Sequence, residues 1–274
     1  MQKSKLIVFI LVLILLLSST MPASAVTDGV PDGEGHPYVV LLLMDVDGSP
    51  AYRCSATLLS PTVVLTAGHC TSNYPEGDYS GMRIFYESDV QNGNNTYPYG
   101  GGPNSIEAVA WYTHPLFETA PFVVHDVGVV ILSAPVPGLT KFGALPSVNQ
   151  LDKLKTRRGL QDVTFTSVGY GLQMSFPDAA SWKEHNQKIR MVAHPKLNQI
   201  NVPGFTGNYS LLLSNNAHTG GTCFGDSGGP NFLGDSNIVA GVTSFGINGN
   251  CAGTGGVFRM DRQDVLDFVG QFLP

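Results

Sequence analysis

The sequence predicts an all-β protein built from many short strands. Of its 274 residues, 43% are hydrophobic and 13% are charged, and 32 glycines and 18 prolines favour tight turns over long helices. Short apolar or alternating runs rich in Val, Leu, Tyr and Thr recur between turn residues, which is typical of a barrel or a sandwich. The runs are Tyr38–Met44, Tyr52–Leu59, Val63–Thr66, Val127–Leu132, Val163–Tyr170, Tyr209–Leu213 and Ile238–Phe245.

One helix is expected, at the C-terminus, where Asp261 could cap a first turn and the apolar residues that follow repeat at helical spacing. These residues are Val265, Phe268, Val269 and Phe272. Residues 73–105 and 172–187 are rich in Gly, Pro and polar residues and are interpreted as long surface loops. The Pro- and Gly-rich stretch 134–151 suggests a connection between two halves of similar length.

The first 25 residues have the pattern of a secretory signal peptide. Lys3 and Lys5 precede an apolar run, Leu6–Leu17, and the segment ends in Ala23-Ser24-Ala25. Twelve apolar residues are fewer than the roughly 20 that cross a bilayer, so cleavage after Ala25 is favoured over a membrane anchor. The mature chain is therefore expected to be secreted and free of the membrane.

Charge and cysteines narrow the class further. The formal charge of −6 becomes −8 without the two lysines of the leader, and an acidic surface disfavours a nucleic acid partner. Four cysteines allow three pairings in an oxidising compartment, and their spacing does not fit a zinc or redox motif. The local pairs are favoured because each brackets a compact segment; they are Cys54 with Cys70 and Cys223 with Cys251.

A candidate nucleophile lies in the segment Gly225-Asp226-Ser227-Gly228-Gly229-Pro230. Glycines around a serine expose its Oγ and let backbone N–H groups approach a reacting carbonyl. The same motif occurs at the nucleophile elbow of α/β-hydrolases, where the histidine follows the serine in the chain. No histidine follows Ser227 in this sequence, so any histidine base must lie upstream.

Among seven histidines, His69 is the best candidate for a general base. It follows the strand-like run ending at Thr66 and is tethered by Cys70, and proton transfer needs a ring held at hydrogen-bond distance. His36, His114, His185, His194 and His218 are interpreted as surface residues. His125 is a weaker candidate, because neighbours on an extended chain point apart and Asp126 is the residue that opens a buried strand. Asp126 is therefore the candidate that orients the imidazole.

The chain resembles the trypsin and chymotrypsin family of serine peptidases in five stretches that occur in the family's order. The stretches are Cys54-Ser55-Ala56-Thr57-Leu58-Leu59, Leu65-Thr66-Ala67-Gly68-His69-Cys70, Asp126 with its apolar strand, Cys223-Phe224-Gly225-Asp226-Ser227-Gly228-Gly229-Pro230, and Ser244-Phe245-Gly246. The resemblance implies two packed six-stranded antiparallel β-barrels, chymotrypsin-like, with a short C-terminal helix. We accordingly expect a signal peptide at 1–25, one barrel at 26–145, and a second barrel with the helix at 146–274.

The resemblance also implies the role of each site residue. Ser227 would attack the scissile carbonyl, His69 would carry the proton and Asp126 would orient His69, while the N–H groups of Gly225 and Ser227 would form the oxyanion hole. Ser244, Phe245 and Gly246 would hold the substrate backbone. The amine of Val26, freed by cleavage after Ala25, would pair with Asp226, although Thr27 and Asp28 depart from the family's usual Val and Gly.

Substrate preference follows from the residues that the resemblance assigns to the specificity pocket, namely Gly221, Thr222, Gly246 and Gly256. An aspartate at the floor would hold Arg or Lys, and Gly221 stands there instead, so an uncharged residue is expected. Glycines at 246 and 256 leave space for a large apolar or aromatic side chain.

The predicted activity is that of a secreted, monomeric serine endopeptidase acting on polypeptides, without cofactor or metal. Turn carboxylates such as Asp45 and Asp47 are more often solvated than bound to calcium. Two alternatives stay open: a catalytically silent binding protein on the same scaffold, and a secreted esterase that uses the same acyl-transfer chemistry.

Overall fold

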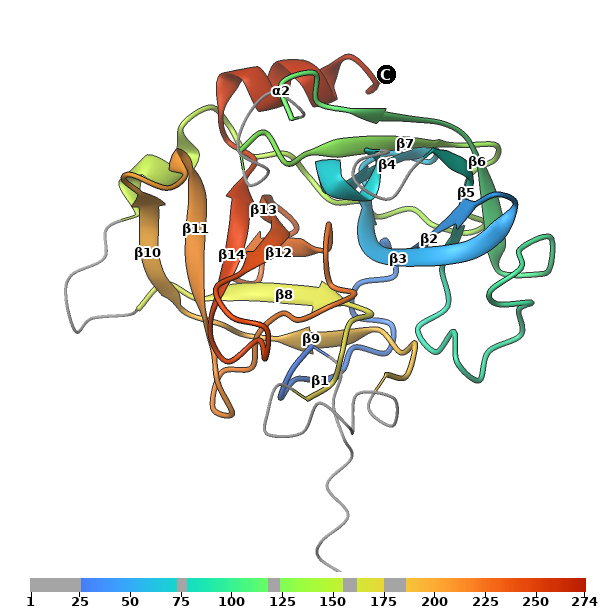
Figure 1. The fold of residues 1–274 in the computed structure, drawn as a ribbon, viewed down its shortest axis with the longest axis horizontal. Coiled ribbons are helices and arrows are strands. Elements are labelled where there is room, and N and C mark those ends of the chain that lie inside the picture. Colours follow the sequence, from blue (N-terminus) through green and yellow to red (C-terminus); the bar gives the residue numbers. More distant parts are fainter. Residues whose placement is uncertain (1–25, 73–77, 118–123, 155–161, 175–185) are drawn as a thin grey trace, which may run out of the picture.

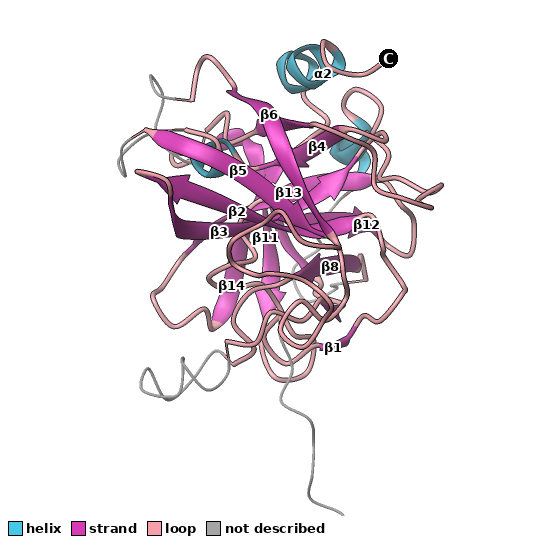
Figure 2. Ribbon diagram, turned by 90° about the vertical axis from the view of Figure 1, so that its right-hand side faces the viewer, coloured by secondary structure: helices cyan, strands magenta, loops and turns pink. Residues whose placement is uncertain are grey.

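The structure is a computed structural model that describes residues 26–72, 78–117, 124–154, 162–174 and 186–274. Two β-sheet units lie side by side, with the helix α2 (Gln263–Gly270) at one end (Figure 1). Strands fill the interior and α2 lies at the periphery beyond β6 in the turned view (Figure 2). No helix in the described part of the chain is long and apolar enough to cross a membrane.

The first unit is a closed barrel of six antiparallel strands in the order β2-β3-β4-β7-β6-β5. Seven of the eight residues of β2 are buried, which is why its sequence is mostly apolar and does not alternate between apolar and polar residues. The strands are β2 (Val39–Val46), β3 (Ser49–Leu58), β4 (Val63–Thr66), β5 (Tyr79–Phe85), β6 (Ser105–Thr113) and β7 (Gly128–Leu132).

The second unit is a curled antiparallel sheet of eight strands in the order β1-β9-β8-β12-β13-β14-β11-β10. Its first strand comes from the start of the described chain and pairs with β9, so the N-terminal segment belongs to this sheet. The strands are β1 (Val30–Pro31), β8 (Phe165–Gly169), β9 (Met191–Ala193), β10 (Leu197–Val202), β11 (Gly207–Asn215), β12 (Pro230–Leu233), β13 (Val239–Gly246) and β14 (Gly253–Arg259).

The largest hydrophobic cluster runs through both units. It joins barrel residues such as Leu42 and Val129 to Phe232 and Val242 of the second sheet and to Val265 of α2. Burial of this continuous apolar surface is the main force that fixes the two units against one another.

The predicted all-β, chymotrypsin-like architecture with a short C-terminal helix is confirmed. Every strand-like run contains a strand. The second unit is a curled sheet of eight strands where a second six-stranded barrel was expected, and it includes β1, which the expected division had assigned to the first barrel. The helix presents Val265, Phe268 and Val269 inward.

Three further expectations need correction. The stretch 73–105 is not one loop, because it contains β5, whose buried residues close the barrel. The helix N-cap is Arg262 without a side-chain cap bond, while the carboxylate of Asp261 instead binds the buried Arg259. His114 is buried rather than a surface residue, at 5% exposure. Most of the expected loop at 172–187, including His185, lies outside the described residues.

Candidate active site

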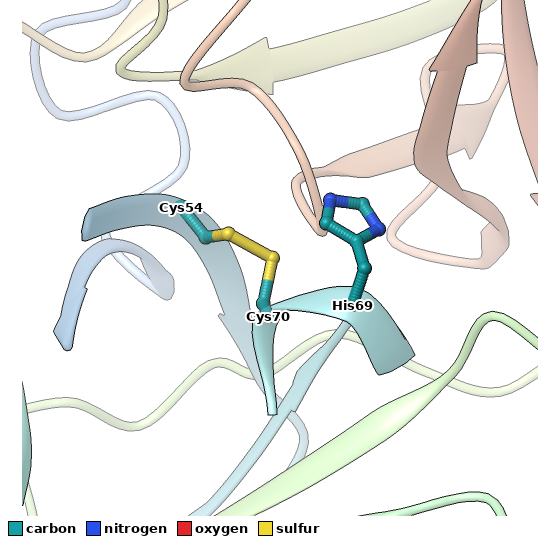
Figure 3. Close-up of side chains that lie close together, drawn as sticks. All are labelled: Cys54, His69 and Cys70. Atoms are coloured by element: carbon teal, nitrogen blue, oxygen red, sulfur yellow. A yellow bond between two sulfur atoms is a disulfide. The ribbon is translucent and has the colours of Figure 1, made fainter. Parts of the chain in front are cut away.

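His69 lies on a short 3-10 helix, η1 (Gly68–Cys70), directly after β4. A disulfide joins Cys70 to Cys54 on β3, so the turn that carries the histidine is tied to the neighbouring strand (Figure 3). The ring remains partly exposed, with 28% of the side chain accessible. This support restrains the backbone while part of the imidazole stays accessible.

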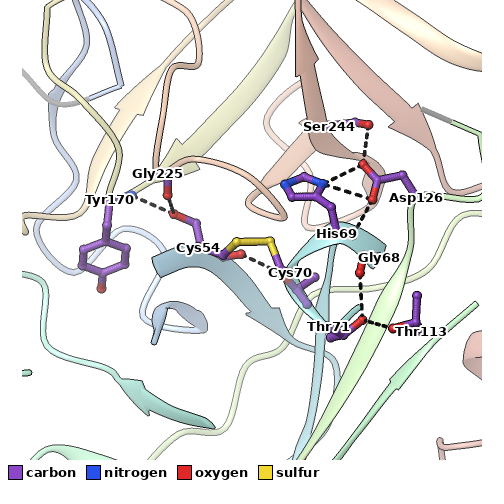
Figure 4. Close-up of a disulfide and its surroundings, with 12 residues drawn as sticks. Cys54, Gly68, His69, Cys70, Thr71, Thr113, Asp126, Tyr170, Gly225 and Ser244 are labelled. Atoms are coloured by element: carbon purple, nitrogen blue, oxygen red, sulfur yellow. Dashed lines mark hydrogen bonds and ion pairs between the residues drawn. A yellow bond between two sulfur atoms is a disulfide. The ribbon is translucent and has the colours of Figure 1, made fainter. Parts of the chain in front are cut away.

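Asp126 is fully buried and binds His69 in two ways. Its carboxylate oxygens lie 3.0 and 3.1 Å from Nδ1 of the ring, and Oδ1 also accepts the backbone N–H of His69 at 2.9 Å. The hydroxyl of Ser244 donates to Oδ2 of the same carboxylate (Figure 4). Because an ionised carboxylate only accepts, the Nδ1 proton faces Asp126 and Nε2 is left as the basic nitrogen.

Ser227 lies in the loop that precedes β12, and this loop packs against the histidine turn. The carbonyl of Ser227 accepts the N–H of Ser55 on β3 at 2.8 Å. Gly228 has a positive φ of 75°, and a Cβ there would lie 1.9 Å from Thr66 Oγ1 and 2.7 Å from the nitrogen of Ala67. Only glycine therefore lets the serine loop approach the chain that leads into η1.

Gly225 supplies the second turn of this loop, with a φ of 96° that favours glycine. Its carbonyl accepts the hydroxyl of Ser55 at 2.9 Å, and that hydroxyl in turn accepts the N–H of Tyr170 at 2.9 Å. Ser55 thus links the loop both to β3 and to the end of β8. Sequence reasoning gave Ser55 no role of its own, although it lies within the strand run Tyr52–Leu59, where a buried polar residue has to find a partner.

Asp226, the residue before Ser227 in this loop, has a fully buried side chain. Its carboxylate accepts the N–H groups of Gly171 at 2.8 Å and Cys223 at 2.9 Å. Burial raises the pKa of Asp226 to about 7, against the lowering effect of these bonds and of the positive charge of Arg53. No ion pair of Asp226 is recorded within the described ranges.

The start of the described chain lies close to the same region. Val26 is fully buried and packs with Met191 and Ala193. Thr27 exchanges backbone contacts with Gly221, and its hydroxyl donates to Asn215 Oδ1 at 2.6 Å. The N-terminal segment therefore braces the chain that leads into the serine loop.

A cavity of about 100 Å³ opens beside Ser227, between the serine loop and β13 and β14. No acidic or basic residue lines it. Its walls are Thr222, Cys223, Phe224, Ser227, Thr243, Ser244, Phe245, Gly246, Asn248, Cys251, Thr254 and Gly255. One side is closed by the disulfide between Cys223 and Cys251, a pairing that the cysteine spacing predicts.

Two residues expected in this pocket do not line it. Gly221 is buried behind it, where a Cβ would lie 2.3 Å from the side chain of Asn215. Gly256 is covered by the ring of Phe245, whose nearest atom would be 2.3 Å from a Cβ. Thr222 and Gly246 do line the cavity, and the roles of Asn215 and Phe245 depend on long-range packing that no local motif reveals.

Two histidines outside this site form a separate cluster with Asp264. The rings of His114 and His125 stack at 4.8 Å and 10°, and Nδ1 of His125 lies 3.2 Å from the carboxylate of Asp264. Burial is the largest cause that lowers the pKa of both histidines. Since the two rings are nearly parallel, their in-plane lone pairs do not converge on one point, and the cluster packs α2 on the barrel.

The comparisons with known proteins point to serine proteases. The family model described as Trypsin matches residues 27–267. Serine protease 1 of Drosophila melanogaster is 26% identical over 82% of the chain and 77% of its own length, and Trypsin of Saccharopolyspora erythraea is 28% identical over 82% and 88%. The solved structure of HL collagenase shares the fold, with a TM-score of 0.66 and 21% identity over 89% of this chain and 97% of its own.

The chain therefore belongs to the Trypsin family. It is a serine-type endopeptidase, a hydrolase whose substrates are polypeptides.

Proposed function

We propose that the protein is a secreted endopeptidase that cleaves peptide bonds through an acyl-enzyme formed on Ser227. The observation that carries the proposal is the convergence of three chain segments: Asp126 holds His69 through Nδ1, and the serine loop packs on the turn that carries His69. Two of these segments come from the barrel and the third from the second sheet, so folding is needed to assemble the site.

In the first step, Oγ of Ser227 attacks the scissile carbonyl carbon while Nε2 of His69 takes the hydroxyl proton. The carbonyl oxygen becomes an oxyanion that accepts the N–H groups of Gly225 and Ser227. The C–N bond then breaks as the imidazolium returns the proton to the amine. Water repeats the sequence on the ester, which releases the new carboxylate and the free serine.

Asp126 supports this chemistry by stabilising the imidazolium and fixing its tautomer. Ser244 donates to the carboxylate oxygen that also faces the ring, so it restrains the aspartate. The backbone from Ser244 to Gly246 borders the cavity and is proposed to pair with the substrate chain.

The proposed specificity is for an uncharged, large apolar or aromatic residue before the scissile bond. The support is the absence of a charged side chain among the described residues that line the cavity, together with the aromatic rings of Phe224 and Phe245. An Arg or Lys of the substrate would be desolvated there without a counter-charge. Peptides that differ only at this residue test the preference, and faster cleavage after Arg than after Phe would contradict it.

Activation is proposed to follow directly from removal of residues 1–25 as a signal peptide. The freed amine of Val26 would then pair with the buried carboxylate of Asp226, which has two N–H donors but no counter-ion in the described part of the chain. The support is the burial of Val26 and the bracing of Thr27 against Gly221. N-terminal sequencing of the active secreted enzyme tests this, and a start beyond Val26 would rule it out.

Active-site labelling tests the central proposal. A peptidyl phosphonate is expected to modify the wild-type chain once, at Ser227, and to abolish peptide cleavage. Ser227→Ala should lose both labelling and cleavage, while Ser236→Ala, a serine in the turn before β13, should keep both. A folded wild-type protein that neither reacts nor cleaves would instead be a binding protein on this scaffold, and turnover of esters without peptides would identify an esterase.

A further inference from the structure

A second hollow lies on the barrel side of the serine loop. It measures about 220 Å³ and shares no lining residue with the cavity beside Ser227. Its walls come from the β2–β3 hairpin and the segment after β5, including Tyr52, Arg53 and Tyr97. No acidic side chain lines it.

Arg53 connects this hollow to the proposed oxyanion hole. A Cβ placed on Gly225 would lie 3.0 Å from Nε of Arg53, so the guanidinium lies directly against the loop that faces the scissile carbonyl. Figure 4 places Gly225 on the Cys54 side of His69 and Ser244 on the opposite side. Arg53 meets the serine loop at Gly225, whereas the cavity is lined by Ser227 and Ser244, so the hollow and the cavity adjoin the loop at different points.

The donors of Arg53 are largely unused. Within the described ranges its one recorded hydrogen bond runs from Nη2 to Oδ1 of Asn186, and Nε is buried without an acceptor. Its nearby carboxylate, Asp226, is fully buried below the loop and is already bonded to two N–H groups. Nε is buried, but Arg53 lines the open hollow and has no salt bridge in the described part of the chain. A guanidinium without a counter-charge beside an open hollow fits a carboxylate, which accepts its N–H bonds.

A second cation stands beside it. Lys188 binds the carbonyl of Asn186 through Nζ at 2.8 Å, and Nζ lies 6.0 Å from the ring centre of Tyr97, which lines the hollow. Burial and the positive charge of Arg53 both lower the pKa of Lys188. Two like charges are thus held together in a chain whose formal net charge is −6, and an incoming anion would relieve their repulsion.

We propose that this hollow is a subsite for an acidic side chain of the substrate, Glu or Asp, at one of the two residues that follow the scissile bond. The inference rests on the proposed function, which places the residue before the scissile bond in the cavity at Ser244. The leaving half of the substrate would then extend past Gly225, away from that cavity. An extended peptide advances about 3.3 Å per residue, so the first or second residue after the bond reaches Arg53.

Quenched fluorescent peptides that differ only in carrying Glu, Gln or Lys at these two positions test the subsite in the secreted enzyme. We expect kcat/KM to be about 5- to 10-fold higher for Glu at one of the positions, and the ratio to fall as salt is raised because the pair is partly solvated. Arg53→Gln should bring the ratio to about 1, and Arg53→Glu should reverse the preference towards Lys, which general damage to the fold does not do. Lys141→Gln, an exposed lysine that does not line the hollow, should leave the ratio unchanged.

Binding to Ser227→Ala separates this inference from the peptidase proposal. Calorimetry with the same Glu and Gln peptides is expected to give tighter binding of the Glu peptide, and Arg53→Gln in this background should remove the difference. Equal affinity and equal kcat/KM for the two peptides would overturn the subsite even if every peptide is cleaved. Absence of cleavage with a retained Glu preference in binding would instead count against the catalytic proposal alone.

Discussion

Asp226 is predicted to make the stability of the chain that keeps residues before Val26 depend on pH. In the structure its carboxyl group is fully buried and its pKa is raised from 3.8 to about 7, with burial as the largest cause. Each unit of pKa difference between the folded and unfolded states corresponds to about 1.4 kcal/mol, so this shift corresponds to about 4 kcal/mol. This is a sizeable part of the roughly 5–15 kcal/mol that separates folded from unfolded domains.

The sign follows from where the proton is held. Between pH 4 and pH 7 the folded chain keeps the proton on Asp226 and the unfolded chain releases it, so the free energy of unfolding falls as the pH rises through this window. Below pH 4 the contribution is fully present, and above pH 7 it is lost. Pairing with the Val26 amine would lower the pKa again, so the chain that starts at Val26 should lose much less stability over the same range.

Urea denaturation at several pH values between 4 and 8 measures this, using chains with Ser227→Ala to prevent self-digestion. The chain that keeps residues before Val26 should show the steep decline, and Asp226→Asn in that chain should remove it. In Asp226→Asn, an NH2 donor replaces one of the two oxygens that accept backbone N–H groups, so the absolute stability also falls. The informative quantity is therefore the slope of stability against pH. An unchanged slope in Asp226→Asn would refute the reasoning, as would equal slopes for the chains with and without the leader.

Three further predictions concern the support of the site. Replacing both Cys54 and Cys70 by Ser should cost about 2–5 kcal/mol of stability and lower kcat, measured by denaturation and peptide turnover, whereas unchanged turnover would show that His69 needs no tether. Ser55→Ala removes a buried hydroxyl with two partners and should cost about 1–3 kcal/mol and reduce kcat more than it raises KM; a change in KM alone would contradict a role in holding the serine loop. Gly228→Ala places a Cβ 1.9 Å from a side-chain oxygen and should abolish labelling by the phosphonate, while normal labelling would show that the loop can shift.

Local motifs carried most of the information about the chemistry. Asp126 could be singled out because a carboxylate opening a buried strand needs a partner, and Ser227 because glycines surround it; the structure places the segments of both beside His69. The seven strand runs could be predicted because their apolar residues are contiguous in the chain. These signals depend only on residues that are neighbours in the sequence, so they can be recognised before the fold is known.

The elements and residues that were missed depend on distant partners. β14 was not among the predicted strands, because its glycines, Gly253, Gly255 and Gly256, disfavour a strand, yet it pairs with both β11 and β13. Arg190 is fully buried, although an arginine is expected at the surface. Its burial is possible because Asp32 neutralises its charge and backbone carbonyls accept its N–H groups. The pocket wall likewise depends on where the ring of Phe245 rests, which only tertiary packing decides.

The site is divided between the two units, and this division explains why its supporting contacts cross their boundary. The barrel supplies His69 and Asp126, while the second sheet supplies Ser227 and the Ser244 hydroxyl that binds Asp126. A displacement of one unit by about 1 Å would move Ser227, the proposed nucleophile, away from His69, the proposed base, although each unit could remain folded. The bonds of Ser55 to the serine loop and the continuous hydrophobic core oppose such a displacement. Catalytic geometry in this fold is therefore a property of the interface between the units, and substitutions there should reduce turnover before they reduce the stability of either unit.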